Sequence, residues 1–312
     1  MKKVIITGAN SFIGRRLTNR LIDRGNHVYA VVRETFKDTE IFKKHNCTIV
    51  RCNMEDYSSL FELIEDKCDV GIAMAWNGTR GGLRNDKTLQ ESNYVYSMDS
   101  IENFIRMGCK KIITSGSQAE YGPVNTDRKT LETDGCFPNT EYGIEKLKTY
   151  HDSAILCKKS GVCLIEPRYF SLYGEDDYYG TMIISIIRRM ISGEKCELTE
   201  CIQTWDFLHV DDAVNALEEL IDSERTKGIY NIGYGESRQL KEYIEIMFQK
   251  TGRKSPLLFG AVPYPATGMV NTNPCIDKLK RDTAWSPKVG FEEGIDRVIN
   301  YQRTIMNQWN SQ

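Results

Sequence analysis

Three side chains of this sequence, Ser117, Tyr142 and Lys146, are the residues best suited to acid–base chemistry. Tyr142 and Lys146 are four positions apart, so on a helix they share one face. A free phenol has a pKa of about 10, and a nearby ammonium group lowers it. Such a tyrosine can give a proton to a carbonyl oxygen as hydride reaches the carbon, or take one from an alcohol in the reverse direction. Only Tyr142 among the sixteen tyrosines has a lysine four positions later. The spacing alone also fits an ordinary surface pair.

The segment from Val4 to Gly14 must position a second reactant. Its β-branched run predicts a strand, and its glycines predict a tight turn. The spacing of the apolar residues after the turn predicts a helix. Gly8 permits the turn, and Gly14 allows close packing of helix on strand. Free N–H groups at the start of that helix suit a pyrophosphate. Two glycines alone equally fit an ordinary strand–helix turn.

The segments that follow alternate between predicted strands and helices. Strands are expected at 28–32, 48–50, 70–75 and 112–115, and helices at 58–64 and around 93–105. This alternation predicts an α/β fold with a doubly wound parallel sheet of Rossmann type. Ser117 follows the fifth strand, and Trp76, Asn77, Thr79 and Arg80 follow the fourth. Ligands bind at the carboxyl ends of such strands.

The end of the second strand bears on the choice of dinucleotide. An acidic residue there binds the adenosine ribose, whereas a basic residue suits a 2′-phosphate. Here Val32 is followed by Arg33, which favours NADP. Glu34 comes next and leaves NAD possible.

Composition excludes several other classes of protein. The 312 residues carry a net charge of −2, which gives no attraction to nucleic acid or to an anionic membrane. No apolar run approaches the roughly 20 residues of a membrane span, and the N-terminus lacks the pattern of a secretory signal. The ten cysteines include no C-x-x-C pair, and none of the four histidines stands at zinc-ligand spacing from a cysteine. We therefore expect a cytoplasmic protein without a metal site.

With these motifs in place, nearly the whole chain resembles the extended short-chain dehydrogenase/reductases of the epimerase/dehydratase type, which act on nucleotide sugars. Residues 7–14 are similar to the T-G-x-x-G-x-x-G turn of that family, except that Ser11 stands at the middle glycine. Asn93 is similar to the asparagine of the helix behind the active site, and segments 166–174, 205–213, 228–233 and 285–298 resemble later parts of the family. By resemblance His209, within one of these segments, is structural.

The resemblance implies a role for each residue of the site. Ser117 would bind the substrate oxygen, Tyr142 would be the acid/base, and Lys146 would hold the nicotinamide ribose and tune Tyr142. Cofactor contacts are expected from Thr7, Gly8, Asn10, Ser11, Phe12, Ile13, Gly14, Arg33, Asn53, Met54, Ala73, Ala75, Tyr142, Lys146 and Tyr169. Substrate contacts are expected from Trp76, Asn77, Thr79, Arg80, Ser117, Gln118, Ser171 and Trp205.

The reaction is narrowed by the residues after Ser117. Dehydratases of the family usually carry acidic residues there, whereas this chain has Gln118 and Ala119, which cannot exchange protons. Trp205 and Pro265 stand where arginines that bind the nucleotide diphosphate are common. We expect a 4-ketoreductase of a nucleotide-linked 4-keto-6-deoxyhexose, with a 4-epimerase holding NAD tightly as the alternative. Less favoured are a non-catalytic dinucleotide-binding regulator and a structural or RNA-associated relative.

The resemblance also predicts the domain organisation. Residues 1–170 with about 203–235 are expected to form the dinucleotide-binding domain. Residues about 171–202 and 236–312 are expected to form a smaller lobe, with the nucleotide sugar in the cleft between the two. A homodimer is expected through the helices around 93–107 and 142–160.

Overall fold

A parallel sheet forms the centre of the molecule. The structure is a computed structural model that describes residues 1–42, 45–124, 128–264 and 269–310. The sheet order is β12-β7-β5-β4-β1-β2-β3, with β6 beside β7, and every pairing is parallel. Its strands are β1 (Lys3–Thr7), β2 (His27–Val32), β3 (Cys47–Arg51), β4 (Val70–Ala73), β5 (Lys111–Ile113), β6 (Gly116–Ser117), β7 (Cys163–Tyr169) and β12 (Gly228–Ile232).

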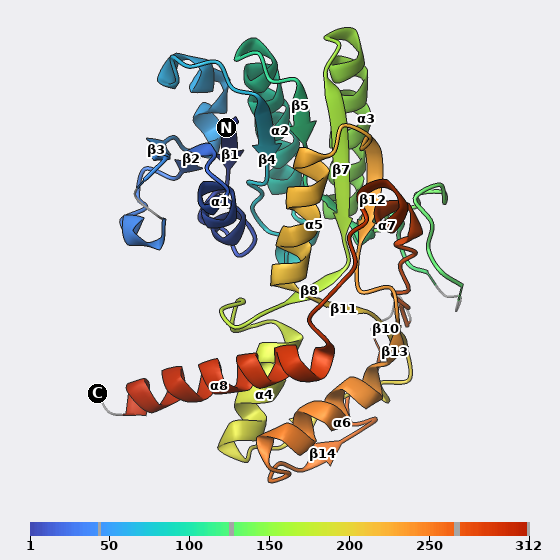
Figure 1. The fold of residues 1–312 in the computed structure, drawn as a ribbon. Helices are drawn as coiled ribbons and strands as arrows, with labels where there is room; N and C mark the ends of the chain where they lie inside the picture. Colours follow the sequence, from blue (N-terminus) through green and yellow to red (C-terminus); the bar gives the residue numbers. More distant parts are fainter. Residues whose placement is uncertain (43–44, 125–127, 265–268, 311–312) are drawn as a thin grey trace.

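Helices cover both faces of this sheet (Figure 1). On one face α1 (Gly14–Asp23), α5 (Val210–Asp222) and α7 (Asp277–Thr283) pack on one apolar cluster. On the other face α2 (Lys87–Arg106), α3 (Glu141–Lys159) and the 3₁₀ segment η2 (Met54–Leu63) share a second cluster. Val4, Ile5 and Ile6 of β1 are fully buried, as a strand covered on both faces requires. The prediction of a doubly wound, Rossmann-type fold is confirmed.

A smaller lobe lies below the sheet in Figure 1. The helices α4 (Met182–Ser192), α6 (Leu240–Thr251) and α8 (Phe291–Asn310) enclose a third apolar cluster. Three two-stranded pairs accompany them: β8 (Ser171–Tyr173) with β11 (Phe207–His209), β9 (Cys196–Glu197) with β14 (Leu257–Leu258), and β10 (Thr204–Trp205) with β13 (Arg238–Gln239). Short 3₁₀ segments complete the structure: η1 (Thr39–Ile41), η3 (Gly81–Asn85) and η4 (Gln118–Glu120).

Two details differ from the sequence-based expectation. The helix expected at 58–64 is the 3₁₀ segment η2, which begins at Met54. The Asn103 side chain donates to the carbonyls of Tyr57 and Ser58 and accepts the N–H of Phe61, so it satisfies backbone groups that an α-helix would pair internally. The strand expected at 70–75 ends at Ala73.

The domain division itself stays a prediction. Ile276, Leu279 and Trp285, which it assigns to the smaller lobe, pack into the cluster under α1 and α5. Among the described residues, no helix is long and apolar enough to cross a lipid bilayer.

Candidate active site

The structure brings Ser117, Tyr142 and Lys146 together. Thr140 caps α3 by accepting the Gly143 N–H, which starts the helix just before Tyr142. Ser117 ends β6, beside β7 at the carboxyl end of the sheet. The Ser117 hydroxyl lies close enough to the Tyr142 phenol to favour the phenolate. Tyr142 and Lys146 are both buried, so the charges near them act with little screening by water.

Lys146 is held mainly by the backbone and by Trp76. Its Nζ donates to the Ser115 carbonyl oxygen at 2.5 Å and lies 3.7 Å from the centroid of the Trp76 ring. The distance from Nζ to the centroid of the Tyr142 ring is longer, 5.8 Å. Burial lowers the pKa of Lys146 to about 7, although the acidic groups Glu120 and Glu166 oppose this shift to the extent that they are ionised. The lysine can therefore change charge near neutral pH.

The pKa of Tyr142 differs from the sequence-based expectation. A nearby ammonium was expected to lower it, but burial raises it, because desolvation outweighs the groups that favour the phenolate. Those groups are the Ser117 hydroxyl, Arg84 and Arg80. Arg84 was missed from sequence. Its guanidinium carbon lies 4.7 Å from the centroid of the Tyr142 ring.

The turn between β1 and α1 has the shape expected of a phosphate cradle. Gly8 has φ +67°, and a Cβ there would lie 2.9 Å from the Ala75 nitrogen. A Cβ on Gly14 would lie 2.3 Å from the Gly8 carbonyl oxygen. Only glycine fits at these two positions. The Ser11 hydroxyl accepts the Gly14 N–H at 3.1 Å, so the residue that departs from the family turn caps the helix. Both glycines are crowded by atoms of the protein itself, so they permit the tight turn and the close approach of α1 that a pyrophosphate site of this kind requires.

The other predicted cofactor contacts surround this turn. Thr7 Oγ1 accepts the Met74 N–H at 3.2 Å, and Asn53 Oδ1 accepts the Glu34 N–H at 3.2 Å. The buried hydroxyl of Tyr169, at the end of β7, has no hydrogen-bond partner among the described residues, which leaves a donor for a ligand. Asn10, Phe12 and Ile13 lie in the turn itself, whereas Met54, Ala73 and Ala75 lie at or just beyond the ends of β3 and β4.

Arg33 and the predicted sugar contacts meet at the ends of β2 and β4. Arg33 Nη2 donates to Asn77 Oδ1 at 2.6 Å. Asn93 of α2 holds the Asn77 backbone, accepting its N–H at 3.0 Å and donating to its carbonyl at 2.8 Å. Trp76 Nε1 donates to Gln90 Oε1 at 2.7 Å, and the Trp76 ring stands edge-on to Tyr142. The loop after β4 is therefore fixed beside Tyr142.

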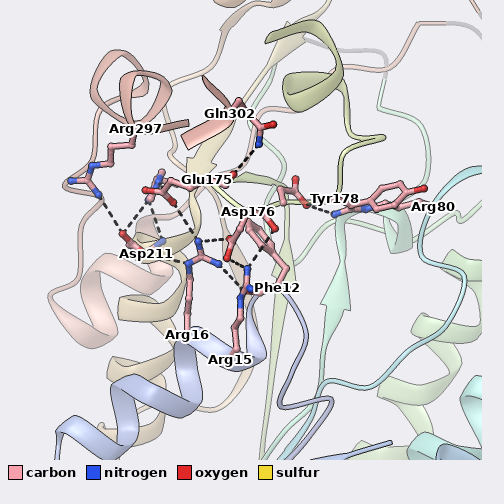
Figure 2. Close-up of polar contacts among 12 residues, drawn as sticks. Phe12, Arg15, Arg16, Arg80, Glu175, Asp176, Tyr178, Asp211, Arg297 and Gln302 are labelled. Carbon is pink, nitrogen blue, oxygen red and sulfur yellow. Dashed lines mark hydrogen bonds and ion pairs between the residues drawn. The ribbon is translucent and has the colours of Figure 1, made fainter. Parts of the chain in front are cut away.

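The five other predicted substrate residues have separate surroundings. Arg80 Nη2 pairs with Asp177 Oδ1 at 2.8 Å (Figure 2), and Thr79 is exposed. Ser171 begins β8. Trp205 packs against the third cluster, in the smaller lobe, so the structure gives it a packing role there. Gln118 has a buried Oε1 without a partner among the described residues. Pro265 lies outside the described residues.

Fold and site together define a Rossmann-type protein whose serine, tyrosine and lysine are assembled at the carboxyl end of the sheet, the end that also carries the glycine turn after β1. The model of the NAD dependent epimerase/dehydratase family matches residues 4–233. The chain belongs to that family and is an enzyme, as its sequence predicts.

Individual relatives differ in the reaction that their names describe. The chain is 26% identical to a UDP-N-acetyl-alpha-D-glucosaminuronate decarboxylase of Bacillus cytotoxicus, over 98% of this chain and 99% of the relative. It is 26% identical to a dTDP-4-dehydro-6-deoxyglucose reductase of Escherichia coli, over 95% of this chain and 96% of that relative. Its fold is similar to the crystal structure of UDP-glucose 4-epimerase from Thermus thermophilus in complex with NAD, with a TM-score of 0.85 and 21% identity over 96% of this chain and 99% of that chain.

Proposed function

We propose that the protein reduces the 4-keto group of a nucleotide-linked 4-keto-6-deoxyhexose with NADPH. The observation that carries the proposal is the assembly of Ser117, Tyr142 and Lys146 at the carboxyl end of the sheet, the end that also carries the turn after β1. Relatives that act on nucleotide sugars, including the Escherichia coli reductase, support the substrate class.

Each of the three side chains has a part in the proposed reaction. The Tyr142 phenol donates its proton to the carbonyl oxygen, so that the ketone becomes a secondary alcohol. The Ser117 hydroxyl, which lies beside the Tyr142 phenol, orients the same oxygen. A protonated Lys146 stabilises the phenolate that remains on Tyr142. When bound, the reduced nicotinamide supplies the hydride to the carbonyl carbon.

Arg33 supports the choice of NADP. It follows β2, where no acidic residue stands at the strand end. A guanidinium there suits a 2′-phosphate. Its hydrogen bond to Asn77 Oδ1 would have to be exchanged for that contact. The NAD bound to the Thermus thermophilus epimerase supports the alternative cofactor.

The alternative reaction is 4-epimerisation of a nucleotide sugar with a retained NAD, which the similarity to the Thermus thermophilus epimerase supports. A 4,6-dehydratase is less favoured, because the neutral side chains of Gln118 and Ala119 follow Ser117. A non-catalytic NADP-binding regulator would not need the buried Tyr142–Lys146 pair. A homodimer formed through α2 and α3, and a cytoplasmic location, stay predictions.

The test is to mix the purified protein with NADPH and a nucleotide 4-keto-6-deoxyhexose and to follow absorbance at the reduced-nicotinamide band. We expect stoichiometric loss of the band with the wild-type protein and no loss with Tyr142→Phe. Tyr301→Phe, which removes an exposed phenol on α8, is the matched control and should react like the wild type. No loss with the wild type, with NAD found in the purified protein, would favour the epimerase.

A further inference from the structure

Three charged side chains are buried behind the candidate active site. Glu120 of η4 is 0% exposed, and Glu166 and Arg168 of β7 are each 1% exposed. Arg168 Nε lies 2.8 Å from Glu120 Oε2 and 3.1 Å from Glu166 Oε1. We call these three residues the buried cluster. The candidate mechanism does not use them.

The charges of the buried cluster do not balance if both acids are ionised. It holds two carboxyl groups and one guanidinium, and an unpaired carboxylate is costly at this depth. Arg168 keeps its charge under all ordinary conditions. Burial and the adjacent Glu120 carboxylate raise the pKa of Glu166 well above its ordinary value. One shared proton would leave the cluster neutral.

The surrounding titratable groups do not supply the missing positive charge. The Tyr121 ring centroid lies 4.6 Å and the Tyr150 ring centroid 5.9 Å from Arg168 Cζ, and the Cys136 thiol contacts Arg168 Nη1 at 3.2 Å. Burial raises the pKa of all three, which keeps them neutral. Lys146 is a further cation that acts on both acids, but among the described residues it forms no ion pair with either, because its Nζ donates to the Ser115 carbonyl oxygen. Glu132 accepts the Asn231 N–H.

The two acids differ in what else they contact. Glu120 Oε1 accepts the Ser117 N–H at 2.6 Å while its Oε2 contacts Arg168. Among the described residues, the Glu166 side chain has only Arg168 Nε and Glu120 itself as polar partners. Glu120 has the Ser117 N–H and the 2.8 Å ion pair with Arg168 to stabilise a negative charge. Its Oε2 has no hydrogen-bond donor among the described residues, and a proton on the adjacent Glu166 would supply one. The negative charge therefore belongs on Glu120, and the proton on Glu166.

The buried cluster is also in direct contact with residues 115–117, the segment that ends at Ser117. A Cβ on Gly116 would lie 2.7 Å from Glu166 Cγ and 3.0 Å from Glu120 Oε1, so the chain passes against both acids. Ser115 accepts the Lys146 hydrogen bond and Ser117 donates to Glu120. Residues 115–117 thus connect the buried cluster to both Lys146 and the Ser117 hydroxyl.

We propose that the buried cluster holds one proton, on Glu166, and that ionised Glu120 is a positioning residue that fixes the Ser117 turn and favours the charged form of Lys146. The proton assignment is independent of the proposed reaction. The positioning role rests on the proposed function, because it concerns Ser117 and Lys146 as catalytic groups.

The first test compares Glu166→Gln with Glu120→Gln, without substrate. An amide can replace a protonated carboxyl, so Glu166→Gln should keep the melting temperature of the wild type at neutral pH, whereas Glu120→Gln should lower it. The infrared difference between wild type and Glu166→Gln should contain the carbonyl band of a protonated carboxyl. Its absence, or equal destabilisation by both substitutions, would overturn the proton assignment.

The pH dependence of stability gives the same assignment a second readout. Because folding raises the pKa of Glu166, the wild-type protein loses stability as pH rises from the ordinary value of 4.5 through the folded value. Glu166→Gln carries no such proton, so its stability should not show this loss as pH rises. Identical slopes in the two proteins would contradict the proposal.

The second test measures the positioning role by the pH profile of turnover. Removing the Glu120 charge lowers the pKa of Lys146, so in Glu120→Gln the alkaline limb of kcat should move to lower pH. Glu120→Asp keeps the charge but is one methylene shorter. It should lower kcat by up to about 100-fold through misplacement of Ser117 and leave the alkaline limb in place.

The outcomes of this test separate the positioning role from a merely structural one. If the alkaline limb of kcat does not move in Glu120→Gln, the proposed effect of Glu120 on the charge of Lys146 is overturned. If Glu120→Asp keeps the kcat of the wild type, the proposed role of Glu120 in positioning Ser117 is overturned. If the wild type shows no ketoreductase activity, the proposed function fails while the infrared and stability results still decide where the proton lies.

Discussion

Two arginine–carboxylate clusters of this protein use the same chemistry at different depths. The buried cluster lies behind Ser117, with every member at most 1% exposed. The second, which we call the interlobe cluster, joins α1 to the smaller lobe and comprises Arg15, Arg16, Glu175, Asp176, Asp211 and Arg297 (Figure 2). Its side chains are 18% to 46% exposed. Water reaches every member of the interlobe cluster, so each charge there has an alternative partner.

This difference in depth reverses the direction of the pKa shifts. In the buried cluster, desolvation raises the pKa of Glu166. In the interlobe cluster, the contact with His209, assisted by Arg16, lowers the pKa of Glu175 to about 2. His209 Nδ1 accepts the Asp211 N–H at 3.3 Å, so Nε2, 3.6 Å from Glu175 Oε2, carries the ring proton. At partial exposure His209 and Arg16 favour the charged form of Glu175, whereas full burial favours a retained proton on Glu166.

The largest expected difference between the two clusters is in the free energy of unfolding after an arginine is removed from each. Arg168→Met leaves a carboxylate buried without its partner and should reduce the free energy of unfolding by about 3–5 kcal/mol. Arg16→Met leaves Asp176 paired with Arg15 and Glu175 beside His209, and should cost about 1 kcal/mol or less. Urea unfolding at neutral pH measures both. Equal losses would mean that depth does not set the energy of these clusters.

Acid tests the interlobe cluster through Glu175. The ordinary pKa of Glu175 is 4.5 and its folded value is about 2, so its stabilising effect is complete above 4.5 and is lost as pH falls toward 2. Between about pH 6 and pH 3, the wild type should lose about 2 kcal/mol more stability than Glu175→Gln. Thermal unfolding across that range is the measurement. Parallel curves for the two proteins would show that Glu175 gains nothing from His209 and Arg16.

The sequence predicts the fold and the identity of the central residues because both depend on local patterns. Strand–helix alternation and the glycine turn are visible in short windows. The four-residue spacing of Tyr142 and Lys146 needs only a helix to bring them to one face. The prediction that His209 is structural agrees with its complete burial, although its role stays a prediction.

The charges around the site could not be predicted, since they depend on contacts between distant segments. Glu120 and Arg168 meet only because β6 pairs with β7. Arg84 faces Tyr142 although the two are far apart in the sequence. Burial raises the pKa of Tyr142, an effect that residue spacing does not reveal. One signal was available: two ionisable residues, Glu166 and Arg168, within a strand otherwise expected to be buried.

The smallest expected effect concerns the outer edge of the interlobe cluster. Arg297 of α8 lies 3.3 Å from Asp211 Oδ2 and also pairs with Glu293, and its side chain is 39% exposed. Arg297→Met should change the free energy of unfolding by less than about 0.5 kcal/mol, and raising the salt concentration should remove even that difference. Urea unfolding of wild type and variant at low and high salt measures it. A salt-independent loss as large as that of Arg168→Met would contradict the comparison, because exposure would then have no bearing on what an arginine contributes.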